Sequence, residues 1–242
     1  MFCDADDMFY NACGLWIIFR EINNGGFDGL ISVFVEETRH PQTKEFLYIN
    51  HDNDNTFVHG KVWNRKYLTT HKIRWNDNLT IHEDSYFNML AISMSKNSKF
   101  CTTSFYLWKW RDESVCRHDP KYILKTYNNM LDSNDALIAE LSSRGLVTQA
   151  NGLVGFMIFD AYYTLNKPEW INQENQEYRI KTELRFKSYY KKHKEQWNDI
   201  PAQDKMQISA SVRNRSIMEG MQMEQQTIND WLQHVENLEE VV

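Results

Sequence analysis

The residues best suited to chemistry stand at the start of the sequence. Asp4, Asp6 and Asp7 place three carboxylates within four residues. Carboxylates this close repel one another unless a cation lies between them, and hard oxygen ligands suit Mg²⁺ or Mn²⁺, which usually bind substrate phosphates as well. The segment predicts a metal site, with a solvated acidic turn or a helix cap as the alternative. On the metal interpretation, Asp6→Ala abolishes Mn²⁺ binding.

A second acidic pair, Glu83 and Asp84, precedes residues 85–94, whose apolar side chains recur at helical spacing. Helix capping is the simpler explanation of the pair, because the dipole at a helix N-terminus favours acidic side chains. The functional alternative makes one carboxylate a general base, which must reach the proton that it removes.

Basic and aromatic side chains alternate at Lys61, Trp63 and Arg65. A strand would place all three on one face, because successive side chains of a strand point to opposite sides. Such a face could hold a phosphate or stack on a ring. The alternative is a half-buried strand whose basic side chains reach the solvent.

An aromatic run over residues 100–110 predicts a strand, and Arg111, Arg117 and His118 follow it. Aromatic residues in such a strand more often form core than a sugar platform. The two arginines and the histidine are better placed, at the predicted strand end, to contact an anion or a metal.

The elements that would position these residues change in type near residue 119. Before it, the sequence predicts a strand end at Phe2-Cys3, strands over 30–35, 45–49 and 100–110, and helices over 14–22 and 85–94. After it, helices are predicted from Asp119-Pro120 to Gly145, then over 154–165, 173–193 and 202–226, with a last one to about residue 238. The sequence therefore predicts an α/β domain over residues 1–118 and a mostly α-helical region over 119–242.

Composition limits the class of protein. The formal net charge of -6 gives no overall field that attracts nucleic acid. The four cysteines show no CxxC spacing, and no apolar stretch approaches the ~20 residues of a membrane span. These features predict a cytoplasmic protein with reduced thiols and no membrane span.

One helical segment, residues 179–194, is strongly basic. Its aromatic residues are interleaved with the cations Arg179, Lys181, Arg185, Lys187, Lys191, Lys192 and Lys194. The run could bind nucleic acid, an anionic acceptor or a membrane face. A solvated helix with i,i+4 pairs such as Glu177–Lys181 is the favoured interpretation.

Taken in order, several segments resemble the inverting, family-2-like GT-A glycosyltransferases. The resemblance covers residues 1–118 and rests on segments 2–7, 28–37, 60–68, 73–75, 82–87 and 106–117. In that family an apolar strand ends in a metal-binding aspartate triplet, and a GK-aromatic-x-R stretch, a Glu-Asp pair and an aromatic strand with Arg and Ser follow. The resemblance implies a partial GT-A (Rossmann-like) sheet domain.

The resemblance also implies an activity, the transfer of a sugar from a nucleoside-diphosphate sugar donor to an acceptor hydroxyl of unknown identity. It gives Asp84 the role of the base and Glu83 that of positioning acceptor or base. The family's other roles fall on metal ligands for Mn²⁺ or Mg²⁺ (Asp4, Asp6, Asp7, with His118) and on substrate-binding residues (Lys61, Trp63, Arg65, Arg111, Arg117).

The family has roughly the first third of its catalytic domain before the aspartate triplet, whereas Met1 stands three residues before Asp4 here. We therefore expect a companion chain that supplies the nucleotide-binding half. Two alternatives stay open: a non-catalytic GT-A remnant acting as an interaction or assembly module, and a nucleic-acid-associated factor that uses the basic helix. The C-terminal helices could also form a homo-oligomer.

Overall fold

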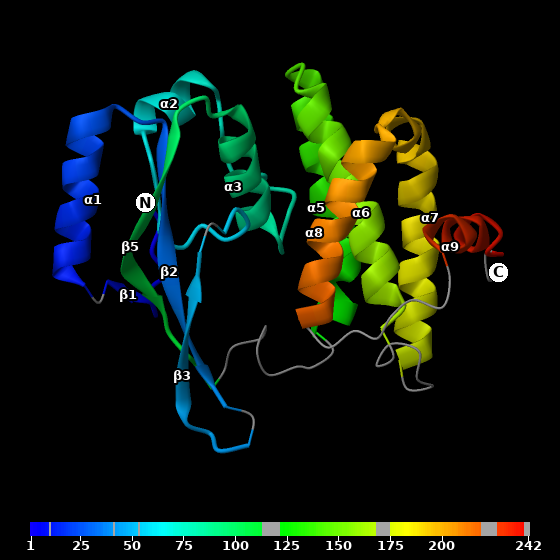
Figure 1. Cartoon of the computed structure of the whole chain (residues 1–242), viewed down its shortest axis with the longest axis horizontal. Helices are drawn as coiled ribbons and strands as arrows, with labels where there is room; N and C mark the ends of the chain where they lie inside the picture. The colour runs from blue at the N-terminus through cyan, green and yellow to red at the C-terminus, as the bar shows by residue number, and fades with distance from the viewer. Residues whose placement is uncertain are drawn as a thin grey trace. The chain divides into compact units, whose positions relative to one another are not determined.

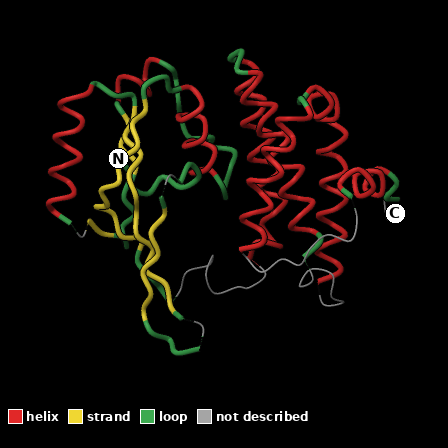
Figure 2. The backbone as a smooth tube through the Cα atoms, in the orientation of Figure 1, coloured by secondary structure: helices red, strands yellow, loops and turns green. Residues whose placement is uncertain are grey.

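The computed structural model describes residues 1–9, 11–40, 42–52, 54–112, 122–167, 175–218 and 227–239. The chain divides into two compact units, Met1–Asp119 and Pro120–Val242. The first unit is α/β, and the described part of the second is entirely helical, as Figures 1 and 2 show. The division falls where the sequence changes character.

A mixed sheet forms the centre of the first unit. Its described strands are β1 (Met8–Phe9), β2 (Gly29–Arg39), β3 (Phe46–His51), β4 (Lys61–Trp63) and β5 (Ser98–Trp108). They lie in the order β1-β5-β2-β3, with β4 paired to the start of β2. Only β2 and β5 run parallel among these pairs. Strand β2 is buried from Gly29 to Val35, and apart from Ser32 the side chains of this stretch are apolar.

Helix α1 (Ala12–Gly25) packs against β5 in this unit. The side chain of Asn11 caps it by accepting a hydrogen bond from the amide of Gly14 at 3.0 Å. A Cβ on Gly14 would lie 2.7 Å from the carbonyl oxygen of Ser104, so glycine allows the close approach of helix and strand. The core beneath the helix consists of Ile18, Leu30, Phe34, Cys101, Phe105 and Tyr106.

The predicted elements over residues 14–22, 30–35, 45–49, 85–94 and 100–110 are confirmed, with shifted ends. The strand end at Phe2-Cys3 is wrong, because residues 1–4 are irregular. Phe2 instead packs edge-on against Trp75 and Phe87, at ring-centroid distances of 5.2 and 5.3 Å. Burial of its ring against two other rings takes the place of strand pairing.

The common strand face of Lys61, Trp63 and Arg65 is also wrong. Strand β4 ends at Trp63, and Asn64 caps helix α2 (Arg65–Thr70) by accepting from the amide of Lys66 at 2.9 Å. Arg65 is therefore the first residue of a helix. Helix α3 (Glu83–Met94) completes the described helices of this unit.

The second unit contains α5 (Tyr122–Ser143), α6 (Val147–Leu165), α7 (Gln176–Asp199), α8 (Ala202–Met218) and α9 (Ile228–Glu236). Helix α6 is central, since it contacts each of the other four and buries most of its residues. Gly145, at φ 77°, ends the first of these helices as predicted. The predicted start at Asp119-Pro120 and the end near residue 226 lie outside the described residues. None of the described helices combines the length and the hydropathy that a bilayer-spanning helix needs.

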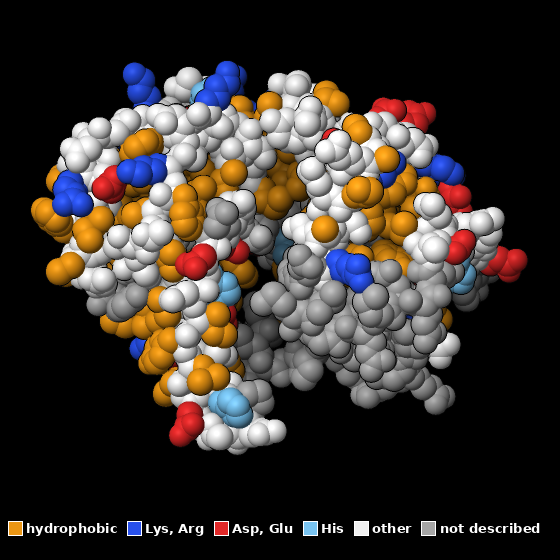
Figure 3. Space-filling model, viewed as in Figure 1, with side chains coloured by type: hydrophobic (Ala, Val, Ile, Leu, Met, Phe, Trp, Pro, Cys, Tyr) orange, Lys and Arg blue, Asp and Glu red, His pale blue; other side chains and the backbone are white. Residues whose placement is uncertain are grey.

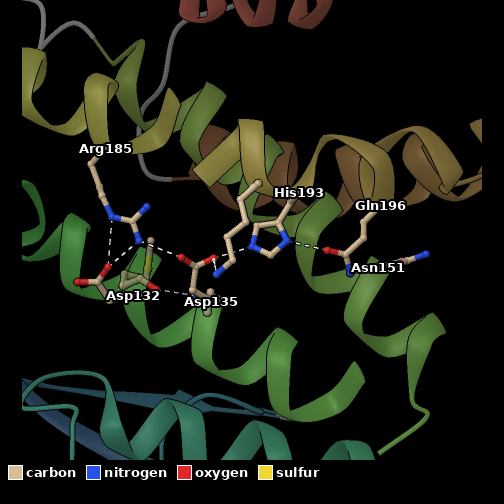
Figure 4. A network of polar contacts seen from close by, with 9 residues as sticks. Asp132, Asp135, Asn151, Arg185, His193 and Gln196 are labelled. Carbon is tan, nitrogen blue, oxygen red and sulfur yellow. Dashed lines mark hydrogen bonds and ion pairs between the residues drawn. The ribbon is translucent and has the colours of Figure 1, made fainter. Parts of the chain in front are cut away.

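A polar network joins α5 to α7 (Figure 4). The carboxylate of Asp135 lies 2.5 Å from Nε2 of His193, 3.0 Å from the guanidinium of Arg185 and 3.2 Å from the ammonium of Lys192. Nδ1 of His193 is 2.6 Å from Oε1 of Gln196. A buried histidine is thus held between two fixed partners, so the network locks the two helices in register.

Candidate metal and acid-base site

Asp4, Asp7 and His59 come together in the first unit. The two aspartates flank a turn before β1, and His59 lies in the turn before β4. Nε2 of His59 is 3.8 Å from Oδ2 of Asp4 and 3.8 Å from Oδ2 of Asp7. One potential ligand atom from each residue lies within 4.8 Å of the other two. Gly60, at φ 67°, allows the tight turn that carries the histidine.

Asp7 is held in place by two hydrogen bonds. The hydroxyl of Tyr106 donates to Oδ2 at 2.6 Å, and the backbone amide of Lys109 donates to Oδ1 at 3.0 Å. The carboxyl side chain is only 1% exposed, and burial raises its pKa. A buried carboxylate oriented by outer partners is typical of a metal ligand, because a cation offsets the cost of burying its charge.

His59 contributes a neutral imidazole. Its ring packs against Phe57, Tyr106 and Trp108 at centroid distances of 5.7, 5.1 and 5.1 Å. Burial lowers its pKa to about 4, against the opposing effect of Asp4, so the ring is uncharged at neutral pH. Nδ1 has no hydrogen-bond partner among the described residues. The neutral form is the one that binds metals.

These three residues fit a divalent ion. Ligand atoms held about 2.1 Å from one ion lie roughly 3 to 4 Å from each other, which agrees with the two distances of 3.8 Å. Asp4 is 65% exposed and free to adjust. Two carboxylates and one neutral imidazole give a mixed oxygen and nitrogen ligand set for a divalent ion.

Asp6, the third member of the predicted triplet, lies apart from this group. Its Oδ2 pairs with Nε of Arg111 at 2.5 Å. The same contact engages Arg111, which the sequence assigned to the substrate. The structure therefore brings together two of the predicted ligands and adds His59, which no short motif signalled.

Lys61 follows His59 by two residues in the sequence and is fully buried. Its ammonium donates to the carbonyl oxygen of His59 at 3.2 Å and lies 3.4 Å from Oδ1 of Asp54. Burial lowers its pKa, while Asp54 and, at longer range, Asp84 favour the charged form. Lys61 thus holds the His59 turn in place and interacts electrostatically with both His59 and Asp84.

Asp84 occupies the first turn of α3 and is half-buried. Burial raises its pKa to about 6, and the adjacent charge of Glu83 adds to the rise. Its Oδ1 accepts a hydrogen bond from the amide of Ser85 at 2.7 Å. A carboxyl group that titrates near neutral pH suits general acid-base chemistry better than an ordinary surface carboxylate does.

The remaining predicted site residues have different positions. Trp63 is buried and packs on Gly29, where an added Cβ would lie 2.4 Å from the indole ring, so it belongs to the core. Arg65 is exposed at the start of α2. Arg117 and His118 lie outside the described residues.

The chain matches no known protein family, and comparison with curated proteins gives no match.

Calorimetric titration with Mn²⁺ should detect one site. Asp7→Asn and His59→Gln should each weaken it by at least about tenfold, since the loss of even an outer partner of a metal ligand has that effect. Asp6→Asn is the matched control and should bind like the wild type, because Asp6 is paired with Arg111. If Asp6→Asn loses Mn²⁺ as Asp7→Asn does while His59→Gln binds like the wild type, the aspartate triplet is the site and His59 is not a ligand.

Proposed function

We propose that the first unit is the catalytic part of a metal-dependent, inverting glycosyltransferase that uses a nucleoside-diphosphate sugar. One observation carries the proposal: the Asp4–Asp7–His59 group and the Asp84 carboxyl lie in one unit, with Lys61 electrostatically coupled to both. Such a transfer needs two parts: residues that bind a metal ion, and a base whose pKa is near neutral.

Each residue has a defined task in this proposal. Asp4, Asp7 and His59 hold Mn²⁺, which when bound neutralises charge on the departing nucleoside diphosphate. Asp84, ionised above about pH 6, accepts the proton of the acceptor hydroxyl as that oxygen attacks the anomeric carbon. Burial is the main cause of the raised pKa of Asp84, and Glu83, which precedes it in the same helical turn, adds to the rise by charge repulsion.

The alternative of nucleic-acid binding has less support. Lys181 of α7 pairs with Glu177 at 2.7 Å, as the i,i+4 spacing predicted, and Arg185 pairs with Asp132 at 2.6 Å. Lys194 pairs with Glu236. Cations already paired with carboxylates contribute little to phosphate binding, because each new contact must replace an existing one.

A protein partner for the first unit has a structural basis. Trp16, Phe19 and Ile22 of α1 are 59%, 64% and 40% exposed, and they recur at a spacing that places them on one side of the helix. Apolar side chains also lie along β3, and Figure 3 shows hydrophobic atoms on the surface over both elements. Exposed apolar side chains on two elements of this unit support the companion chain. In contrast, Trp231 of α9 is only 1% exposed and belongs to the core of the second unit, so it is not available to a homo-oligomer interface.

The activity can be tested on the full chain with a panel of UDP-, GDP-, dTDP- and ADP-sugars, each with Mn²⁺. We expect one donor to release its nucleoside diphosphate, because bound donors hydrolyse slowly even without an acceptor. Chelation should stop the release, and Asp7→Asn should lower it by at least about tenfold through loss of the ion. Absence of both release and Mn²⁺-dependent binding for every donor would contradict the proposal.

A further inference from the structure

The first unit contains a pocket of about 230 Å³ that the proposed mechanism does not use. It lies where the start of the chain meets α2, α3 and the loop between them. Its walls are apolar and cationic, and the lining residues are Phe2, Arg65, Leu68, Thr69, Ile73, Arg74, Trp75 and Phe87.

The apolar part of the pocket is an aromatic platform. Trp75 stacks on Phe87 with centroids 4.7 Å apart and planes at 12°. Phe2 stands edge-on to both rings. These contacts fix the indole, and Trp75 remains half-exposed. A fixed, half-exposed indole can contact a flat ligand surface at little entropic cost.

The cationic part consists of Arg65 and Arg74, which are both exposed. Neither guanidinium forms a hydrogen bond or an ion pair with another side chain in the described part of the chain. Arg111, by contrast, is paired with Asp6. Guanidinium groups bind phosphate and carboxylate in a bidentate manner, so two unpaired ones beside one pocket favour an anionic ligand.

The size and position of the pocket limit the ligand further. Pockets for drug-sized ligands span roughly 300–1,000 Å³, so 230 Å³ fits one ring with its charged group better than a whole nucleotide. Phe87 lies three residues from Asp84 on α3, which places the two on adjacent turns of one face. One wall of the pocket is therefore one helical turn from Asp84, the group that takes the acceptor proton in the proposed function.

We propose that this pocket binds a sugar ring that carries a phosphate or a carboxylate, and that this ring belongs to the acceptor. The assignment to the acceptor rests on the proposed transferase function, whereas the ring and the anion follow from the pocket itself. The ring lies on Trp75, and its charged group lies between Arg65 and Arg74.

The test uses the full chain without metal or donor, and follows the indole resonance of Trp75 by NMR. The probes are glucose 6-phosphate, glucuronate, glucose and inorganic phosphate. We expect one or both charged sugars to bind, and glucose and phosphate alone to bind at least about tenfold more weakly, since each lacks one half of the recognition. Whichever charged sugar binds more tightly shows whether the pocket prefers a phosphate or a carboxylate.

Arg65→Gln and Arg74→Gln should each weaken binding of the charged sugar by about tenfold or more, and Trp75→Ala should weaken it similarly. Arg20→Gln is the matched control, because Arg20 is also exposed and lies over an indole, that of Trp16, at 5.0 Å. Its affinity for the charged sugar should be unchanged.

Two results would overturn the inference: no binding of either charged sugar, or equal weakening by Arg20→Gln and Arg65→Gln. If Mn²⁺-dependent release of nucleoside diphosphate persists in that case, the transferase proposal stands and only the pocket assignment fails. If the charged sugar binds as expected but no donor is cleaved, the pocket stands and the transferase proposal fails.

Discussion

Asp84→Asn is expected to stabilise the first unit by about 2 to 3 kcal/mol at pH 8 and by nearly nothing at pH 4. The reason is that burial raises the pKa of the folded carboxyl from 3.8 to about 6. Below the unfolded pKa both states are protonated and carry no penalty. As pH rises through the folded pKa, the free energy of unfolding of the wild type falls, because the folded protein must then ionise a half-buried group. Asparagine never ionises and keeps an oxygen for the amide of Ser85.

The same variant is expected to lower turnover by roughly 10²- to 10⁴-fold, the usual contribution of a general base. Because asparagine keeps an oxygen for the amide of Ser85, a loss of turnover in this variant reports the loss of a base and not the loss of a helix cap. Urea unfolding of the full chain at several pH values, with hydrogen exchange of the β2 amides as the probe of this unit, measures the first effect.

Asp77→Asn is the control for both measurements, since Asp77 is an exposed carboxyl in the same unit. It should change stability by less than about 0.5 kcal/mol at any pH. A wild-type turnover in Asp84→Asn would move the role of the base to another residue. A stability difference that does not vary with pH would show that Asp84 titrates as an ordinary surface carboxyl.

Much of the fold could be predicted from local pattern. The apolar run of β2 and the spacing in α3 are local signals, since each follows from which face of one element is buried. The prediction of a strand end at Phe2-Cys3 was wrong for the opposite reason. Phe2 has strand-like neighbours in the sequence, but its position depends on Trp75 and Phe87, far along the chain.

The candidate site was predictable only in its acidic members. Asp4 and Asp7 stand out as neighbours in the sequence, but which carboxylates of a turn converge depends on the backbone, and Asp6 turns toward Arg111. His59 joins them through the pairing of β4 with β2, a contact between distant segments. Likewise, the cap at Asn64 ended the strand that was expected to carry Arg65. Sequence spacing identified chemically capable residues but not their partners.

In the second unit, Asp135→Ala is expected to destabilise the fold by about 3 to 5 kcal/mol at neutral pH, the usual cost of removing one partner of a buried ionic contact. Without this carboxylate, Nε2 of His193, a residue only 4% exposed, loses its partner, and Arg185 keeps Asp132 alone. The free energy of unfolding of Asp135→Asn should lie between those of the wild type and Asp135→Ala, because asparagine keeps one oxygen acceptor. Asp132→Ala is the matched control on the same helix, since Asp132 also pairs with Arg185 but is 56% exposed. It should cost at most about 1 kcal/mol.

The pH dependence of this loss has a definite sign. Burial alone would raise the pKa of Asp135, but hydrogen bonds from His193 and Arg185 outweigh burial and lower it below 3.8. A carboxyl whose folded pKa is depressed stabilises the protein above its unfolded pKa and loses that contribution as pH falls through the folded value. The difference between wild type and Asp135→Ala should therefore be constant from about pH 6 to 8 and shrink below about pH 4. Urea unfolding monitored by hydrogen exchange of the α6 amides measures it, because α6 packs against both α5 and α7. A loss of under 1 kcal/mol, or equal losses in Asp132→Ala and Asp135→Ala, would show that the network is a surface feature and that apolar packing alone sets the register of α5 and α7.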